Sequence, residues 1–223
     1  GRIKSGMQEN DLDAIILKLP ENVLYASQYW PIMGHSYFIF PLEQEPVLII
    51  PETEQRWTNR SWVKRLISYG WESLATIKSP LETAADLIRE IFSEYGLTKS
   101  RVGYEESFEH ISASSQNGGV IVNYPGVPTC EMYFSTLPEA EFRDITELLY
   151  RLRAVKTDHE IALIKNVNEI ADHGLEVFYE SVDEGKHEYE IGVSVEKAVV
   201  ETALEEGKNE SCLLYTSDAA DEE

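Results

Sequence analysis

Short apolar runs alternate with helical patterns over the first part of the chain, and this alternation constrains the fold more than any other feature. The apolar runs expected to form strands cover residues 14–19, 37–40, 47–50, 74–77, 101–104 and 120–124. The patterns expected to form helices cover residues 52–66, 81–95 and 139–152. Such alternation is typical of an α/β domain, in which helices cover the faces of a sheet.

Composition excludes several classes of protein. The 223 residues include 19 Lys and Arg against 40 Asp and Glu, a formal net charge of -21. Such a chain repels polyanions, so neither nucleic acid nor an anionic membrane is an expected partner. No apolar run reaches the roughly eighteen residues of a membrane span, and no signal peptide is evident, so a cytoplasmic location is expected. Cys130 and Cys212 form neither a disulfide framework nor a zinc-binding spacing.

A second module is expected after residue 157. Thr157 and Glu160 have the spacing of a capping box at the start of a helix. Two adjacent apolar stripes follow as far as Val182, which predicts a long and largely buried helix, and a weaker helical pattern covers residues 188–204. Two helices without further strands cannot cover so much apolar surface, so we expect an exposed apolar patch in this module.

Both ends of the sequence look cut. Gly1 opens the chain without an initiator methionine. Residues 212–222 continue no helical pattern and resemble the translation of a transposon-type sequencing adaptor. Residues 208–223 are therefore expected to be an adaptor-derived or disordered tail, and a genuine acidic tail is the alternative.

Two motifs resemble a known family. Residues 152–161 read L-R-A-V-K-T-D-H-E-I, residues 185–191 read G-K-H-E-Y-E-I, and residues 22–25 fit an N-x-x-Y turn. Together they resemble the creatinase and Xaa-Pro aminopeptidase or prolidase family over roughly residues 1–207. His187, where the family usually has Thr or Ser, is one departure from the pattern.

The resemblance implies an architecture and an activity for the parent protein. It implies a creatinase-like N-terminal domain with a mixed sheet flanked by helices over residues 1–150, then the first helices of a truncated pita-bread catalytic domain over 151–207. The parent is expected to be a homodimeric metallo-aminopeptidase that hydrolyses peptides next to proline with two divalent metal ions, Mn or Zn. The alternatives are a creatinase-like hydrolase of a small non-peptide C–N bond and a non-catalytic dimerisation or binding module.

The residues that would carry this chemistry are not evident in the chain. In the family, two Asp, one His and two Glu hold the metals, and all are expected downstream of the last helix. His159 and His173 share one predicted helix but are separated along it by about 21 Å, so they cannot bind one ion. The acidic cluster of Glu105, Glu106 and Glu109 is interpreted as a solvated face. We therefore predict no catalytic residue, no metal and no peptidase activity for the chain as given.

One loop offers candidate substrate-binding residues. Residues 29–35 are rich in aromatic side chains and include Trp30 and His35. In relatives this neighbourhood tends to approach the active-site cleft, and an indole ring can stack on a substrate ring. Packing of Trp30 in the core is the alternative.

Overall fold

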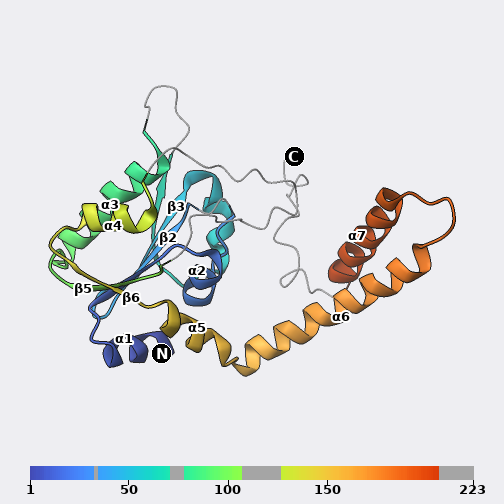
Figure 1. The fold of residues 1–223 in the computed structure, drawn as a ribbon, viewed down its shortest axis with the longest axis horizontal. Coiled ribbons are helices and arrows are strands. Elements are labelled where there is room, and N and C mark those ends of the chain that lie inside the picture. Colours follow the sequence, from blue (N-terminus) through green and yellow to red (C-terminus); the bar gives the residue numbers. More distant parts are fainter. Residues whose placement is uncertain (33–34, 71–77, 107–126, 206–223) are drawn as a thin grey trace. The chain divides into compact units, whose positions relative to one another are not determined.

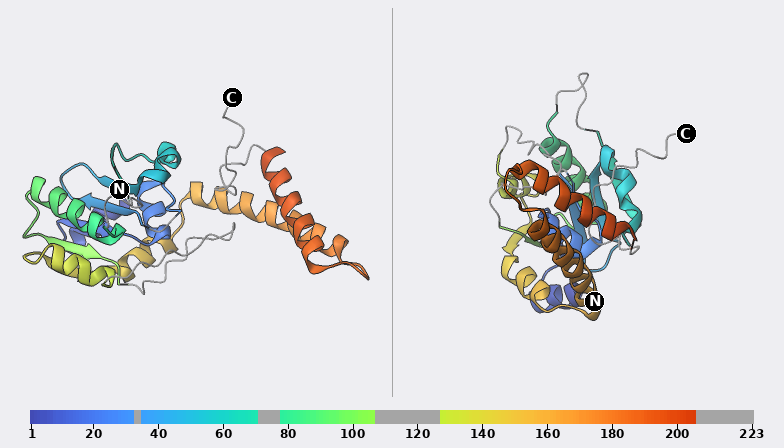
Figure 2. Two further views of the ribbon diagram at one scale, coloured as in Figure 1. Left: turned by 90° about the horizontal axis from the view of Figure 1, so that it is seen from above. Right: turned by 90° about the vertical axis from the view of Figure 1, so that its right-hand side faces the viewer.

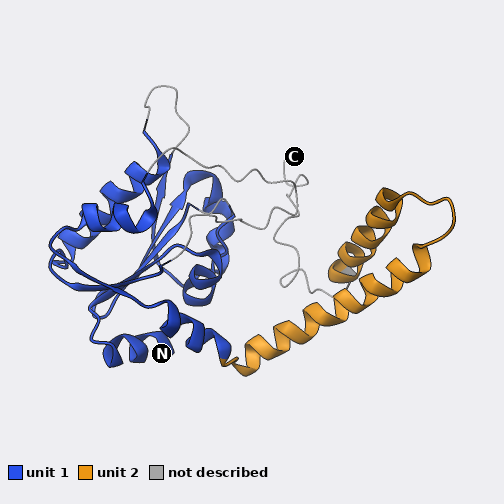
Figure 3. Cartoon of the chain, in the orientation of Figure 1, with its two compact units in different colours: residues 1–154 blue, residues 155–223 orange. Residues whose placement is uncertain are grey.

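The computed structural model describes residues 1–32, 35–70, 78–106 and 127–205. The chain divides into two compact units, residues 1–154 and residues 155–223, which Figure 3 colours separately. The expected strands at residues 74–77 and 120–124, and the tail at 208–223, lie outside the described residues.

A mixed sheet forms the centre of unit 1 (Figure 1). Its order among the described residues is β4-β3-β2-β1-β5-β6. The β1–β2 and β2–β3 pairs are antiparallel, whereas β3–β4, β1–β5 and β5–β6 are parallel. The strands are β1 (Ala14–Leu17), β2 (Tyr37–Pro41), β3 (Val47–Pro51), β4 (Arg65–Tyr69), β5 (Arg101–Tyr104) and β6 (Glu141–Asp144).

Helices cover both faces of this sheet (Figures 1 and 2). They are α1 (Arg2–Glu9), α2 (Pro20–Ser27), the 3-10 helix η1 (Glu52–Arg60), α3 (Pro80–Glu94), α4 (Thr129–Thr136) and α5 (Thr146–Ala154). Successive β1 side chains point to opposite faces, so Ile16 packs in the cluster that includes α3 and α4, and Ile15 in the cluster that includes α1, α2 and α5. The predicted α/β class, with a mixed sheet flanked by helices, is confirmed.

Unit 2 is a pair of helices, α6 (Asp158–Ser181) and α7 (Glu188–Glu205), packed along each other. The predicted capping box is present: Thr157 Oγ1 accepts from the Glu160 N–H at 3.2 Å, and the Glu160 carboxylate accepts from the Thr157 N–H at 2.8 Å. The helices approach closely at Gly174, where an added Cβ would lie 2.8 Å from a Val199 methyl group. A glycine at this position therefore allows the contact.

Two predicted helices were only partly right. Residues 52–60 form η1 and β4 begins at residue 65, whereas residues 141–144 form β6 and α5 begins at residue 146. Both missed strands lie at the edges of the sheet, where pairing with β3 and β5 decides their conformation. The N-x-x-Y segment, expected as a turn, lies in α2.

The prediction that the first helix of unit 2 is largely buried was also wrong. Within α6 only Ile170 and Gly174 are buried. The expected apolar patch is confirmed, because large apolar side chains of α6 and its C-cap are exposed: Ile161, Ile164, Leu175, Phe178 and Val182. Among the described residues, no helix combines the length and apolarity needed to cross a membrane.

Candidate functional site

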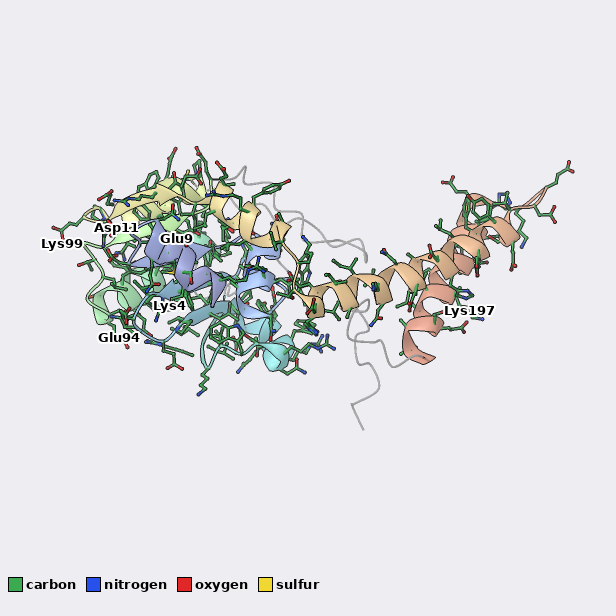
Figure 4. The ribbon with its side chains drawn as sticks, turned by 90° about the horizontal axis from the view of Figure 1, so that it is seen from below. Lys4, Glu9, Asp11, Glu94, Lys99 and Lys197 are labelled. Atoms are coloured by element: carbon green, nitrogen blue, oxygen red, sulfur yellow. The ribbon has the colours of Figure 1, made fainter. Side chains whose placement is uncertain are left out.

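Most charged side chains lie on the surface, as the labelled side chains in Figure 4 show. They form exposed ion pairs such as Lys99 with Glu139 and Lys197 with Glu201. Exposed pairs contribute little to stability. Two carboxylates of unit 1, those of Glu54 and Glu105, are instead buried, and each organises a cluster of hydrogen bonds.

Glu54 holds the loop that carries Trp30 and His35. Its carboxylate, which is fully buried, accepts hydrogen bonds from the Tyr29 hydroxyl and from the Ile32 N–H, the latter at 2.9 Å. Burial, with the neighbouring Glu54 charge as a second cause, raises the pKa of Tyr29 far above its ordinary value, so the phenol keeps its proton and remains a donor. One carboxylate thus fixes the backbone on the α2 side of the loop.

The two predicted substrate-binding residues lie at opposite ends of this loop. Trp30 follows α2 by three residues and is half-buried, and its indole N–H has no hydrogen-bond partner among the described residues. His35 is half-buried two residues before β2, and its carbonyl accepts from the Tyr69 hydroxyl at 2.6 Å. Residues 33 and 34 between them lie outside the described residues. The structure therefore anchors both ends of the loop to the sheet domain.

Glu105 was interpreted as part of a solvated face, and this was wrong. It is only 7% exposed and lies just beyond the carboxyl end of β5. Its carboxylate accepts from the backbone N–H groups of Lys18 at 2.7 Å and Leu19 at 2.9 Å, and from the Asn22 amide at 2.7 Å. Burial raises its pKa to about 7 and outweighs the three donors, which act in the opposite direction. Glu106 is exposed, and residue 109 lies outside the described residues.

The Glu105 cluster brings together the two motifs on which the resemblance rests. The Asn22 amide oxygen accepts from the Arg153 guanidinium at 3.0 Å, and the Tyr25 hydroxyl donates to the Leu152 carbonyl at 3.3 Å. Asn22 and Tyr25 are the N-x-x-Y residues, and Leu152 and Arg153 begin the junction motif. The sequence indicated each motif separately but gave no sign that a buried carboxylate would connect them.

The described residues do not offer the donors of a two-metal centre. Over residues 1–32, 35–70, 78–106 and 127–205, no group of three or more His, Cys, Asp or Glu side chains could hold a metal ion. His159 and His173 both lie on α6, and the Nδ1 of His173 is 3.6 Å from a Glu176 oxygen at the surface. Residue 110 lies outside the described part.

Unit 2 carries an open apolar groove. Its volume is about 770 Å³, and its lining is Phe178, Val182, Lys186, Glu188, Ile191, Gly192, Val195 and Glu196. Its surface is mostly apolar, which suits packing against another apolar surface better than acid–base chemistry.

Comparison with known proteins identifies the family. Residues 1–155 match the family described as Creatinase/Prolidase N-terminal domain. The chain belongs to this family. The resemblance stated from the two motifs is therefore confirmed, and the matched residues include all of unit 1.

Relatives of the creatinase/prolidase family include enzymes of two kinds. The chain is 22% identical to the creatinase of Bacillus sp. (strain B-0618), over 89% of this chain and 43% of the relative. It is 26% identical to the Xaa-Pro dipeptidase of Pyrococcus furiosus, over 85% of this chain and 44% of the relative. The chain thus spans a little under half the length of each of these two curated relatives.

Solved structures share the fold. A prolidase from Pyrococcus horikoshii OT3 aligns with 90% of this chain and 48% of its own length, with a TM-score of 0.62 at 22% identity. A prolidase from Pyrococcus furiosus gives the same TM-score at 24% identity, over 90% of this chain and 52% of its own. These alignments extend beyond unit 1, because unit 1 alone is a smaller share of the chain.

Proposed function

We propose that this chain is the N-terminal part of a metal-dependent hydrolase that cleaves peptide bonds next to proline. The observation that carries the proposal is the family match over residues 1–155, together with relatives that include an Xaa-Pro dipeptidase. In this proposal, the described residues supply the scaffold and one substrate loop. The two divalent metal ions, Mn or Zn, would be held by residues outside the described part, since the described residues do not offer the donors.

The loop of residues 29–35, which Glu54 of η1 holds, is the part of this chain that would contact substrate. The half-buried indole of Trp30 has an apolar face and an N–H without a partner among the described residues. A flat aromatic side chain of this kind suits the ring of a proline substrate. In this proposal Trp30 and His35 contact substrate, and Glu54 holds the loop in place for them. Homodimer formation and a cytoplasmic location are further parts of the proposal.

The apolar groove of unit 2 supports the same proposal. A soluble protein rarely leaves such a surface exposed without a partner. In a protein twice as long, the remaining half would cover α6 and α7 and would bring the metal-binding side chains with it.

A creatinase-like activity is the second candidate, because a creatinase is among the relatives at a similar identity. A longer product of the same gene, assayed with an Xaa-Pro dipeptide and with creatine, separates the two. Turnover of the dipeptide alone supports the proposal, and turnover of creatine alone contradicts it.

Variants of the longer protein test the loop. Trp30→Leu is expected to raise KM for the dipeptide, whereas the control Tyr150→Leu, which removes an exposed aromatic side chain of α5, is expected to leave KM unchanged. Equal KM values for Trp30→Leu and wild type would leave Trp30 as a packing residue.

A further inference from the structure

The amide of Asn22 lies between two buried or half-buried charged groups of opposite sign. Its Nδ2 donates to Glu105 Oε1 at 2.7 Å, and its Oδ1 accepts from Arg153 Nη1 at 3.0 Å. An amide has a donor end and an acceptor end, so only one orientation satisfies both neighbours. This orientation requires Glu105 to be an acceptor, as an ionised carboxylate is.

Protonation of Glu105 would weaken this arrangement. The other carboxylate oxygen, Oε2, is already occupied by the N–H groups of Lys18 and Leu19, so the oxygen available for a proton is Oε1. Oε1 has a second lone pair beside the one that the Asn22 NH2 group uses, so a proton there leaves this NH2 group bound to a neutral and weaker acceptor. The amide could turn its oxygen to Glu105, but its NH2 group would then face the guanidinium of Arg153. In either case one contact of the series is weakened or lost.

We propose that Glu105, Asn22 and Arg153 form a proton-sensitive clamp that holds the last turn of α5 when Glu105 is ionised and releases it when Glu105 is protonated. Arg153 lies in that last turn, and unit 1 ends at the next residue, Ala154. The clamp therefore acts where the chain passes from unit 1 into unit 2. This inference does not depend on the proposed peptidase activity.

The groups around Glu105 place the transition near neutral pH. Burial raises the Glu105 pKa to about 7, and Glu21 on α2 adds a like charge that also favours protonation. Lys18, which follows β1, directs its ammonium group to the Thr129 hydroxyl at the start of α4. Arg153 is the charged group that faces the cluster from α5. The N–H and amide donors from the β1–α2 segment oppose protonation without preventing it.

Two contacts of the same turn do not involve Glu105. The Leu152 carbonyl accepts from the Arg2 guanidinium at 2.8 Å and from the Tyr25 hydroxyl at 3.3 Å. Release is therefore expected to be a local loosening of the end of α5 rather than unfolding of unit 1.

Hydrogen exchange of the 223-residue chain tests the clamp. Protection factors of the amides of residues 151–154 are measured at pH 6 and pH 8, with intrinsic exchange corrected at each pH. We expect roughly tenfold lower protection at pH 6, the size that the change from a charged to a neutral acceptor gives. Glu105→Gln carries no charge at any pH, and with its oxygen on the Lys18 and Leu19 N–H groups its NH2 group faces the Asn22 NH2 group, so low protection is expected at both pH values.

Two variants control the experiment. Glu106→Gln removes the neighbouring exposed carboxyl group and is expected to behave as wild type. The double variant Glu105→Gln with Asn22→Asp places a carboxylate between two donors, the new amide at position 105 and the Arg153 guanidinium, so high protection is expected at both pH values. Equal wild-type protection at pH 6 and pH 8, or an equal effect of Glu106→Gln, would overturn the proposal.

An NMR titration of the wild type covers the case in which a variant fails to fold. The Glu105 carboxyl carbon, the Asn22 side-chain amide and the Arg153 guanidinium are expected to titrate with one midpoint near neutral pH. Separate midpoints, or a Glu105 midpoint with no response at Arg153, would also overturn the proposal.

Discussion

Replacement of Glu105 by glutamine is expected to remove a large pH-dependent term from the stability of unit 1. Burial raises the pKa of this carboxyl from 4.5 to about 7. An acid with a higher pKa in the folded state binds its proton more tightly there, so its stabilising contribution is present below pH 4.5 and is lost as the pH rises through 7. Between pH 5 and pH 8, the free energy of unfolding of the wild type relative to the variant should therefore fall by about 2.5 kcal/mol.

Urea unfolding followed by tryptophan fluorescence measures this difference, because the four tryptophans all lie between residues 30 and 71, within unit 1. Glu106→Gln serves as the matched control and is expected to follow the wild type at each pH. A difference between wild type and Glu105→Gln that is constant from pH 5 to pH 8 would refute the reasoning. A change of opposite sign would mean that the three hydrogen bonds to Glu105 outweigh the cost of burying its charge.

Three further substitutions test individual contacts. Thr157→Ala removes the capping box and should lower the stability of unit 2 by about 1 kcal/mol in thermal unfolding followed by circular dichroism, with Thr157→Ser as the control; equal melting of both would contradict it. Gly174→Val places a side chain against α7 and should cost about 1 to 3 kcal/mol in the same assay, whereas Gly192→Ala, which meets open space, should not destabilise. Tyr29→Phe deprives buried Glu54 of a donor and should cost about 1 to 3 kcal/mol in urea unfolding; an unchanged midpoint would count against that hydrogen bond.

The central strands were predictable because the sheet covers them on both sides. The residues of β1 and β3 are all buried, and a strand buried on both faces reads as a continuous apolar run. The edge strands β4 and β6 have alternating or largely polar sequences. Their conformation depends on hydrogen bonds to the neighbouring strands β3 and β5. The periodicity of apolar residues within a strand gives no information about such pairing.

The buried carboxylates could not be predicted for a related reason. Glu105 is separated by 87 residues from Lys18, whose N–H it binds, and those donors are backbone groups with no sequence signature. A carboxylate in an acidic stretch is more often solvated. The family resemblance indicated Asn22 and Arg153 as motif residues, but only the fold shows that they meet across 131 positions of the chain.

Under the proposed function, this chain would supply a scaffold and a substrate loop, and residues outside the described part would supply the metal-binding chemistry. The most direct measurement compares hydrolysis of an Xaa-Pro dipeptide, with Mn²⁺ present, by the purified 223-residue chain and by a longer product of the same gene. We predict turnover by the longer product and none by the shorter chain. Turnover by the shorter chain would contradict the proposed function.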